Sequence, residues 1–294
     1  MDRITASPPN QAALLGLDLN GIMWTDATVN PGLYGCAKVS PACLNCYAEE
    51  MAARIVRMGG KPTGPNARYA EGLVNGRWAG RVSVHPDRVP VEFRKIPWTL
   101  GKVRRVFVTS MSDLFHEDVP FDFIDSVFVE MAARPQVFQV LTKRAERMAA
   151  YAAQRVLPWP ANVWAGVTVE DQRRADERIP SLLQVPAAVR FLSVEPMLGA
   201  IEIPSEFLTG EYAPHDFGGV MAEEDGPRIS WVIVGSESDG PRPGARETDP
   251  AWVLDIVDQC DRADVACFVK QIAIGDRLIS LPLIDGRPRA DFPA

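Results

Sequence analysis

The sequence predicts an α/β fold and favours a full or partial (β/α) barrel over a two-sided open sheet. Seven short apolar runs lack the alternation of half-exposed strands, as expected for parallel strands covered on both faces. Helical segments lie between most of these runs, which predicts right-handed βαβ crossovers. The 294 residues, 47% hydrophobic and 23% charged, suffice for a sizeable core. We expect one domain over residues 1–294.

The predicted elements alternate along the chain. The apolar runs lie at 21–24, 104–110, 137–142, 163–169, 189–194, 230–235 and 266–271. Helical patterns lie at 45–58, 121–133, 145–156, 171–184 and 250–263. The fourth helix is expected to break before Pro180, and Asp171 suits its N-cap.

Two segments do not fit this alternation. Residues 59–100 are long and rich in Gly, Pro and Trp, and residues 199–229 resemble a loop insertion. Long loops within a compact domain are usually functional lids or disordered excursions. We expect both insertions to influence specificity.

Polar residues follow the predicted strands. In barrels and doubly wound sheets the carboxyl ends of the strands meet at one face, where active sites form. Lys143 and Glu195 stand out because charged residues are rarely buried, although they could also pair with each other or with helix ends. The other candidates at these ends are Ser110, Ser112, Asp113, His116, Thr168, Glu170 and Glu237.

The cysteine loop at 34–47 contains three of the five cysteines in a C-x6-C-x2-C pattern: Cys36, Cys43 and Cys46. Structural zinc usually needs a fourth protein ligand, which His85, His116 or His215 could supply. Buried thiols without a ligand are a second interpretation. An iron–sulfur cluster with one iron left open to a small molecule is the third, and the position of the loop at the predicted catalytic face favours it.

Several motifs together resemble a phage-associated three-cysteine-motif family of unknown function, which is similar to radical S-adenosylmethionine (SAM) enzymes. The resemblance covers about residues 22–273. It rests on "TDATVNPGLYGCAKVSPACLNCYAEEMAAR", "RVFVTSMSDLFHEDVP", "FQVLTKRAERM", "VWAGVTVEDQRRADERIP", "RFLSVEPMLG" and "WVIVGSES". It implies a partial α/β barrel of the radical-SAM or TIM-like type, with a three-cysteine loop after its first strand.

The resemblance also implies a cofactor site. Cys36, Cys43 and Cys46 would bind a [4Fe–4S] cluster, and the amino and carboxylate groups of SAM would chelate the open iron. The first gap of the motif is three residues longer than in the common C-x3-C-x2-C pattern, whereas the second gap is the same. Tyr47 follows the last cysteine, as in several such loops.

Further SAM contacts are expected at the strand ends. The second strand of radical SAM enzymes usually carries a Gly-Gly-Glu motif for the methionine amino group. Here "TSMSD" lacks those glycines, and Ser110, Ser112 and Asp113 occupy its place. Thr168 and Glu170 fit a ribose contact. Glu195 and the "VGSES" turn with Glu237 would line the adenine or the substrate.

The implied chemistry is cleavage of SAM to a 5′-deoxyadenosyl radical that abstracts hydrogen from a substrate. Asp113, His116 and Lys143 are the candidate acids, bases or substrate anchors, and Glu195 is a further catalytic candidate. Cys260 and Cys267 could donate a hydrogen atom, but their helical and strand settings favour core packing.

A nucleic acid or a nucleotide is the expected substrate, from the phage association and a general likeness to lyases that repair DNA photoproducts. A net charge of −7 gives no general attraction to nucleic acid. Local basic residues could bind phosphates, and loop tryptophans could stack on bases, although solvated charges and loop-plugging rings are the alternative. The residues concerned are 102–105, Arg94, Lys95, 142–147, Arg242, Arg246, Trp78, Trp98 and Trp159.

Other functions stay open. The chain could be a non-catalytic module, stabilised by zinc or an iron–sulfur cluster, that recruits a partner protein encoded nearby, or a redox-sensing cluster protein. An odd number of cysteines, no secretion signal and no apolar run near the roughly 20 residues of a membrane span predict a cytoplasmic protein without membrane contact.

Overall fold

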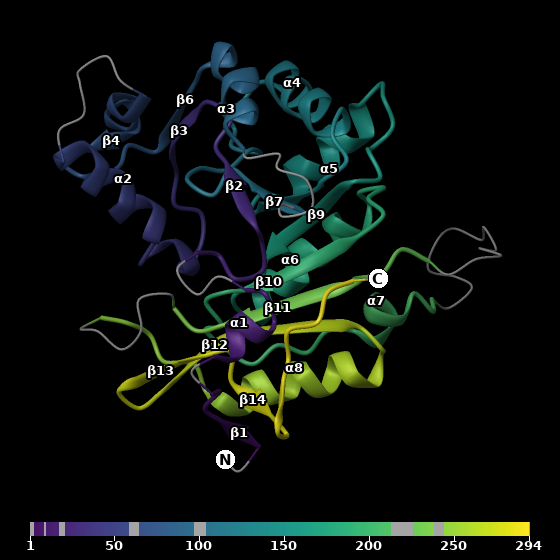
Figure 1. The fold of residues 1–294 in the computed structure, drawn as a ribbon. Helices are drawn as coiled ribbons and strands as arrows, with labels where there is room; N and C mark the ends of the chain where they lie inside the picture. Colours follow the sequence, from purple (N-terminus) through teal and green to yellow (C-terminus); the bar gives the residue numbers. More distant parts are fainter. Residues whose placement is uncertain are drawn as a thin grey trace. The chain divides into compact units, whose positions relative to one another are not determined.

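The fold is mixed α/β and contains a large, mostly parallel sheet. The computed structural model of the chain describes residues 3–8, 10–17, 21–58, 65–96, 104–212, 226–237 and 244–293. The sheet has eight strands in the order β13-β12-β11-β10-β9-β8-β7-β2 (Figure 1). The pairs β2·β7, β7·β8, β9·β10, β10·β11 and β11·β12 are parallel, and β12·β13 is antiparallel.

Two compact units make up the chain. One comprises Thr25–Trp164, and the other combines Met1–Trp24 with Ala165–Ala294. We call them the central unit and the terminal unit.

The central unit holds the first strands of the large sheet and two small antiparallel sheets, β3·β6 and β4·β5. Its strands are β2 (Ala27–Val29), β3 (Leu33–Cys36), β4 (Leu73–Val74), β5 (Arg77–Trp78), β6 (Arg81–Val84), β7 (Arg105–Val108) and β8 (Val137–Thr142). Its α-helices are α2 (Tyr47–Arg57), α3 (Val89–Lys95), α4 (Phe121–Ala132) and α5 (Ala145–Gln154). Three 3₁₀ helices accompany them, η1 (Pro41–Cys43), η2 (Pro65–Gly72) and η3 (Pro86–Arg88).

The terminal unit continues the βα alternation. Its strands are β1 (Ile4–Thr5), β10 (Arg190–Val194), β11 (Trp231–Gly235), β12 (Ala266–Ile274), β13 (Arg277–Ser280), β14 (Leu283–Ile284) and β15 (Arg287–Pro288). Its helices are α1 (Gln11–Leu14), α6 (Gln172–Leu183), α7 (Ser205–Thr209) and α8 (Pro250–Arg262). Strand β9 (Val163–Thr168) begins in the central unit and ends here.

Large aromatic residues fill the core of the terminal unit. Trp231 is fully buried, with its ring 6.2 Å from that of Trp24 and 5.6 Å from that of Phe191. A Cβ at Gly166 would lie 2.3 Å from the Phe191 ring, so only glycine leaves room for this ring on the neighbouring strand. The continuous apolar strands are therefore buried on both faces, as the sequence predicts.

In the central unit, α2 packs on the small sheets through a cluster that includes Tyr34, Ala52 and Tyr69. Gly35 and Gly72 bring the backbones of β3 and η2 together. A Cβ on Gly35, which has φ +106°, would lie 2.3 Å from the Arg81 carbonyl oxygen. Glycine is thus required directly before Cys36.

The predicted strands and helices from residue 104 onward are confirmed, and two details are wrong. Residues 21–24, predicted as the first strand, form bends and turns instead. Their apolar character reflects Met23 and Trp24, which are buried core side chains. The first strand of the large sheet along the chain is β2. Helix α6 continues through Pro180. The side chains of Ile179 and Leu182, before and after this proline, are buried and hold the helix against the core. The Asp171 cap is confirmed by its bond from the Arg174 amide at 2.9 Å.

The expected insertion at 59–100 contains regular structure. Residues 59–64 and 97–100 lie outside the described residues, but between them the chain forms η2, β4, β5, β6, η3 and α3. Strands of two to four residues are too short for hydrophobic periodicity to reveal. Of the insertion at 199–229, residues 213–225 lie outside the described part, and α7 lies within the rest.

Within the described residues, none of the helices combines the length and the apolar character that a bilayer crossing requires.

Candidate functional site

The cysteine loop joins β3 to α2 in the central unit. Cys36 ends β3, Cys43 ends η1, and Cys46 directly precedes α2. All three thiols are free and partly exposed. Cys43 and Cys46 both act electrostatically on Cys36. The three cysteines thus belong to one loop, and Cys43 and Cys46 lie near enough to Cys36 to influence its thiol.

Cys36 is a protonated thiol in this setting. Burial raises its pKa to about 12, the Asp113 carboxylate adds to the rise, and Arg144 opposes it. Metal ligation requires the thiolate, so binding would release this proton. Among the described residues, no group of three or more His, Cys, Asp or Glu side chains is arranged to hold a metal ion.

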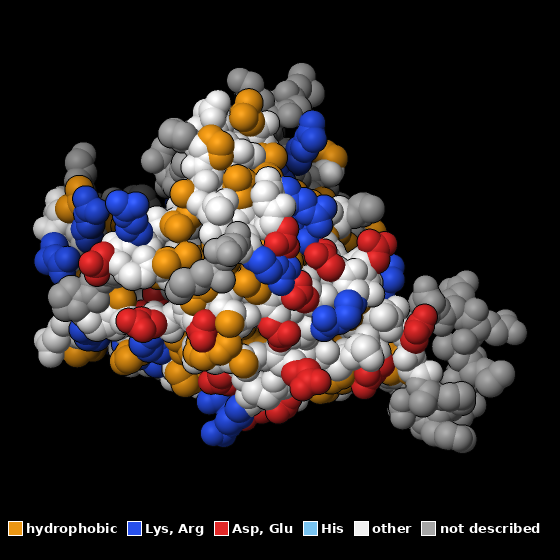
Figure 2. Space-filling view, turned by 90° about the horizontal axis from the view of Figure 1, so that it is seen from below, with side chains coloured by type: hydrophobic (Ala, Val, Ile, Leu, Met, Phe, Trp, Pro, Cys, Tyr) orange, Lys and Arg blue, Asp and Glu red, His pale blue; other side chains and the backbone are white. Residues whose placement is uncertain are grey.

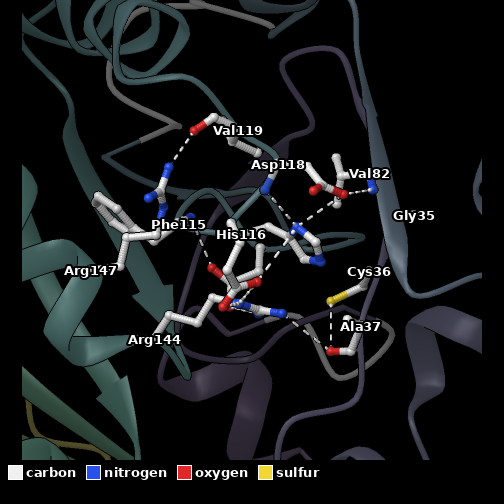
Figure 3. Close-up of polar contacts among 12 residues, drawn as sticks. Gly35, Cys36, Ala37, Val82, Phe115, His116, Asp118, Val119, Arg144 and Arg147 are labelled. Atoms are coloured by element: carbon white, nitrogen blue, oxygen red, sulfur yellow. Dashed lines mark hydrogen bonds and ion pairs between the residues drawn. The ribbon is translucent and has the colours of Figure 1, made fainter.

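Arg144 connects the cysteine loop to the ends of β7 and β8 (Figure 3). Its Nη1 donates to Asp113 Oδ2 at 2.8 Å, and its Nε lies 2.9 Å from both carboxylate oxygens of Glu117. Its Nη2 donates to the Ala37 carbonyl at 3.4 Å, one residue after Cys36. Burial alone would lower the pKa of Arg144, but Asp113, Cys36 and Glu117 outweigh burial and raise it. Arg144 is thus a fixed positive charge beside the loop.

The Asp113 carboxylate accepts hydrogen bonds from four donors. Its Oδ1 accepts from Thr142 Oγ1 at 2.7 Å and from the Phe115 amide at 2.9 Å. Its Oδ2 accepts from Arg144 and from the Lys143 amide at 3.3 Å. This arrangement suits an anchor between two strand ends better than the acid or base that the sequence predicts.

His116 is buried, with only 2% of its surface exposed. Its Nδ1 accepts from the Asp118 amide at 3.1 Å, and its Nε2 has no hydrogen-bond partner among the described residues. Burial and then the charge of Arg144 lower the pKa of His116, so the ring is neutral and carries its proton on Nε2. In Figure 3 this nitrogen lies on the side of the ring that faces Cys36.

Two serines and Tyr47 tie the cysteine loop to the segment after β7. Ser112 Oγ donates to the Gly35 carbonyl at 2.6 Å, and Tyr47 donates through its hydroxyl to the Ser110 carbonyl at 2.6 Å. The Ser110 hydroxyl lies 3.2 Å from Asn30 Nδ2. The residues predicted to contact SAM therefore lie next to the predicted cluster ligands, and their hydroxyls already have partners.

A family model covers most of the chain. It describes a protein family of unknown function, DUF5131, and matches residues 20–277. The chain belongs to the DUF5131 family. No curated protein and no solved structure matches. The match includes the cysteine loop and every site residue predicted from the sequence.

In this DUF5131 protein, Thr109 is a site residue that the sequence analysis missed. It follows β7 with φ +66°, a strained conformation for a β-branched residue. The residue is 3% exposed, and within the described part of the chain its Oγ1 has no hydrogen-bond partner. Backbone strain of this kind concentrates at functional sites. No sequence signal reveals it, because Thr109 continues an ordinary strand pattern.

Glu49, on α2, is a second residue that was missed. Its side chain is 1% exposed, yet it accepts from the Trp78 amide at 2.8 Å and from Arg77 at 2.9 Å, and it pairs with Lys38 at 3.0 Å. Burial favours the protonated carboxyl, but these three partners outweigh burial and lower its pKa. Glu49 therefore holds Lys38, inside the cysteine loop, against α2 and β5.

Lys143 follows β8 in the central unit, whereas the other four predicted residues lie in the terminal unit and have partners there. Arg178 donates to the Thr168 carbonyl at 2.7 Å and to Glu170 at 2.9 Å. Glu237 pairs with Arg246. Glu195 lies 3.2 Å from Lys270 Nζ and accepts from Trp24 Nε1 at 3.3 Å. Ion pairs at strand ends hold these carboxylates in place.

The two described tryptophans among the base-stacking candidates, Trp78 and Trp159, pack against core residues. Trp159 is 8% exposed, donates to the Val163 carbonyl and packs against Phe128, with 4.8 Å between ring centroids. The expectation that Trp159 stacks on bases is wrong, because its ring is buried among core side chains. Trp78 packs against the α2 cluster, and Trp98 lies outside the described residues.

Proposed function

We propose that this protein is an iron–sulfur enzyme of the radical SAM type, built on a full or partial (β/α) barrel. The observation that carries the proposal is a loop with three free cysteines, Cys36, Cys43 and Cys46, which Arg144 joins to the strand-end carboxylate of Asp113 through the Ala37 carbonyl. Catalytic groups at the carboxyl ends of parallel strands support it further.

The donor set fits a [4Fe–4S] cluster chemically. Three free thiols from one loop are the ligands that such clusters use, and they leave one iron for SAM. When bound, the cluster and SAM would supply a 5′-deoxyadenosyl radical for hydrogen abstraction. Arg144 would offset the negative charge of the thiolates, and Ser112 and Tyr47 would hold the loop in position.

The histidines favour this proposal over a zinc site. His116 accepts at Nδ1 and so carries its proton on Nε2, which makes that nitrogen a hydrogen-bond donor and not a metal ligand. His85 Nε2 lies 2.9 Å from Glu71, and His215 lies outside the described residues. A tetrahedral zinc site needs a fourth ligand, and His116 in this tautomer does not supply one.

We assign the contacts to SAM beyond the cysteine loop to strand-end residues. The hydroxyl of Thr109 joins Ser110 and Ser112 as a candidate for the methionine moiety, because it is buried and has no partner. Thr168 and Glu170 remain the candidates for the ribose, and Glu195 and Glu237 for the adenine or the substrate. Lys143 remains a candidate acid or substrate anchor.

We propose a nucleic acid or a nucleotide as the substrate, and a cytoplasmic setting in which the three thiols stay reduced. A partner protein encoded nearby is compatible with this activity. Support for the substrate comes from cations that flank the cysteine loop, Lys38 within it and Arg81 opposite Cys36 in the β3·β6 register.

The proposal is tested by anaerobic purification followed by iron, sulfide and zinc analysis and electron paramagnetic resonance. We expect about four irons and four sulfides per chain, with a spectrum that changes when SAM is added. Cys43→Ser should lose the cluster. Cys260→Ala, a control at a buried cysteine of α8, should retain it. Stoichiometric zinc without a cluster, after reconstitution with iron and sulfide, would overturn the proposal in favour of a metal-stabilised recruiting module.

A further inference from the structure

The charges of this protein are segregated along the chain. Residues 31–96 contain ten Lys and Arg residues but five Asp and Glu residues, a net charge of +5, whereas the whole chain carries −7. This basic segment forms α2, η2, α3 and the two small sheets, and it contains the cysteine loop. On the face drawn in Figure 2, acidic and basic side chains are mixed over the described surface. The segment is therefore a local exception in an acidic protein.

Three cations lie at the cysteine loop itself. Lys38 is part of the loop, and Arg81 faces Cys36 across the β3·β6 ladder. Arg77 shares the Glu49 carboxylate with Lys38, at 2.9 and 3.0 Å. The buried Glu49 carboxylate thus holds two cations, and its single negative charge compensates only one positive charge. The exposed fractions of 39% for Lys38 and 68% for Arg77 leave both able to reach a ligand.

Helix α2 extends this charge away from the cysteines. Arg54 and Arg57 occupy its last turn and are exposed. No ion pair joins Arg54, Arg57 or Arg81 to an acidic side chain in the described part of the chain. Eleven helical residues span about 16 Å, several times the rise of roughly 3.4 Å per nucleotide along a duplex axis. The arrangement suits a polymer better than a single nucleotide.

An exposed aromatic ring lies at the start of α2, the end opposite to Arg54 and Arg57. Tyr47 begins α2, directly after Cys46, and 40% of its surface is exposed. Its hydroxyl bond to the Ser110 carbonyl at 2.6 Å fixes the ring. Proteins that bind single-stranded nucleic acid combine a basic track for phosphates with aromatic platforms for bases.

We propose that Lys38, Arg54, Arg57, Arg77 and Arg81, together with Tyr47, form a binding surface for a single-stranded nucleic acid beside the cysteine loop. As the identification of the substrate of that loop, this inference rests on the proposed function. The rest of the chain, which carries the excess of acidic residues, repels a polyanion and directs it to this surface.

Binding is measured by fluorescence anisotropy with a labelled strand of about 16 nucleotides, on protein with and without a reconstituted cluster. We expect the affinity to fall steeply between about 50 and 200 mM KCl. Arg54→Gln/Arg57→Gln and Arg77→Gln/Arg81→Gln should each weaken binding and reduce the salt slope by about 1.4, since each phosphate contact on a single strand contributes about 0.7. Arg173→Gln, at a side chain of α6 that is 76% exposed, is the control for loss of an exposed positive charge outside this surface and should bind normally.

Equal losses in Arg173→Gln, absence of binding at about 50 mM KCl, or a preference for anionic lipid vesicles over the strand would overturn the inference. Cluster content, assayed on the same preparations, separates the two proposals. A protein that forms the cluster but does not bind the strand retains the proposed chemistry and loses this substrate. A protein that binds the strand but forms no cluster retains the surface and loses the chemistry.

Discussion

Arg144 shows how much a single buried charge can organise. Its guanidinium contacts a strand-end carboxylate, a loop carboxylate and a carbonyl of the cysteine loop. Removing one member of a buried pair leaves the other charge without compensation. Asp113, with a side chain 8% exposed, would be that uncompensated charge.

We therefore expect Arg144→Ala to lower the free energy of unfolding by about 3 kcal/mol. Urea unfolding at neutral pH, followed by circular dichroism, measures the change. Arg173→Ala, at an exposed ion pair, should stay within about 0.5 kcal/mol of the parent protein. A loss of the same size in both variants would contradict the anchoring role of Arg144.

His116 permits a prediction about the proposed cluster. Its Nε2–H is a buried donor without a partner, on the side of the ring that faces Cys36. Hydrogen bonds to cluster sulfurs raise the reduction potential. We expect His116→Phe to bind the same amount of iron but to show a potential lower by about 60 mV, roughly 1.4 kcal/mol for one electron.

Potentiometric titration monitored by electron paramagnetic resonance measures this shift. His116→Gln can still donate from its side-chain amide and should recover part of the difference. An unchanged potential in His116→Phe, at full iron content, would show that the ring does not donate to the cluster.

At the scale of the elements, Asp26 fastens β2 to the start of β7. Its Oδ2 accepts from the Arg104 and Arg105 amides at 2.9 and 2.8 Å, and its Oδ1 pairs with the Arg105 side chain at 3.1 Å. Burial favours the protonated acid, but these bonds outweigh burial and lower the pKa of Asp26. The ionised carboxylate thus stabilises the strand that precedes the cysteine loop.

The sign of the pH dependence follows. Because the folded-state pKa lies below the unfolded value near 3.9, the stabilisation is complete above that pH and is lost as the pH falls through the folded-state pKa. We expect Asp26→Asn to lower the free energy of unfolding by about 1 kcal/mol between about pH 5 and 7. The effect should become much smaller below about pH 4, as the carboxylate of the parent protein is protonated. Urea unfolding across this range tests it. If the loss of unfolding free energy did not change with pH, the effect of the substitution would come from packing and not from the charge of Asp26.

The success of sequence-based prediction also varied by element. The strands from β7 to β12 were predictable because long apolar runs between helices leave few alternatives. Strand β2, with three residues, was not predictable, since the apolar run before it supplies core residues instead. The small sheets around the cysteine loop depend on the contact of Gly35 with Gly72, which joins residues distant in sequence.

The candidate site was predictable to a similar degree. Cysteine spacing and polar strand ends identify Cys36, Cys43, Cys46 and Asp113 from the sequence. The partners that organise them come from other elements, so Arg144 and Glu49 resemble ordinary helix-flanking charges until the fold places them. Thr109 differs from its neighbours only in its backbone angle.

At the scale of the whole molecule, the first strand and the C-terminal segment both pack within the terminal unit. Strand β1 pairs with β14. The segment after β15 covers the large sheet, where Trp231 Nε1 donates to the Asp291 carbonyl at 2.9 Å and the Phe292 ring lies 5.3 Å from the Trp231 ring. The Val269 amide donates to the Arg289 carbonyl at 2.8 Å.

Deleting residues 287–294 should therefore destabilise the terminal unit by at least about 3 kcal/mol, through the lost hydrogen bonds and ring contacts. Urea unfolding followed by tryptophan fluorescence measures the loss and reports on newly exposed Trp231. Arg287→Ala leaves the segment in place, and its side chain is 68% exposed, so it should change little. A stable deletion variant would show that this cover is dispensable.

Protein contacts fasten the cysteine loop to its neighbours: Lys38 on Glu49, Ala37 on Arg144 and Gly35 on Ser112. Zinc fingers need their metal in order to fold, whereas these three contacts do not involve the cysteine side chains. In the cell, a scaffold that builds the proposed cluster could then deliver it to an already folded chain. Maturation would be a late and reversible event, and loss of the cluster to oxygen would leave an apoprotein ready for repair instead of degradation.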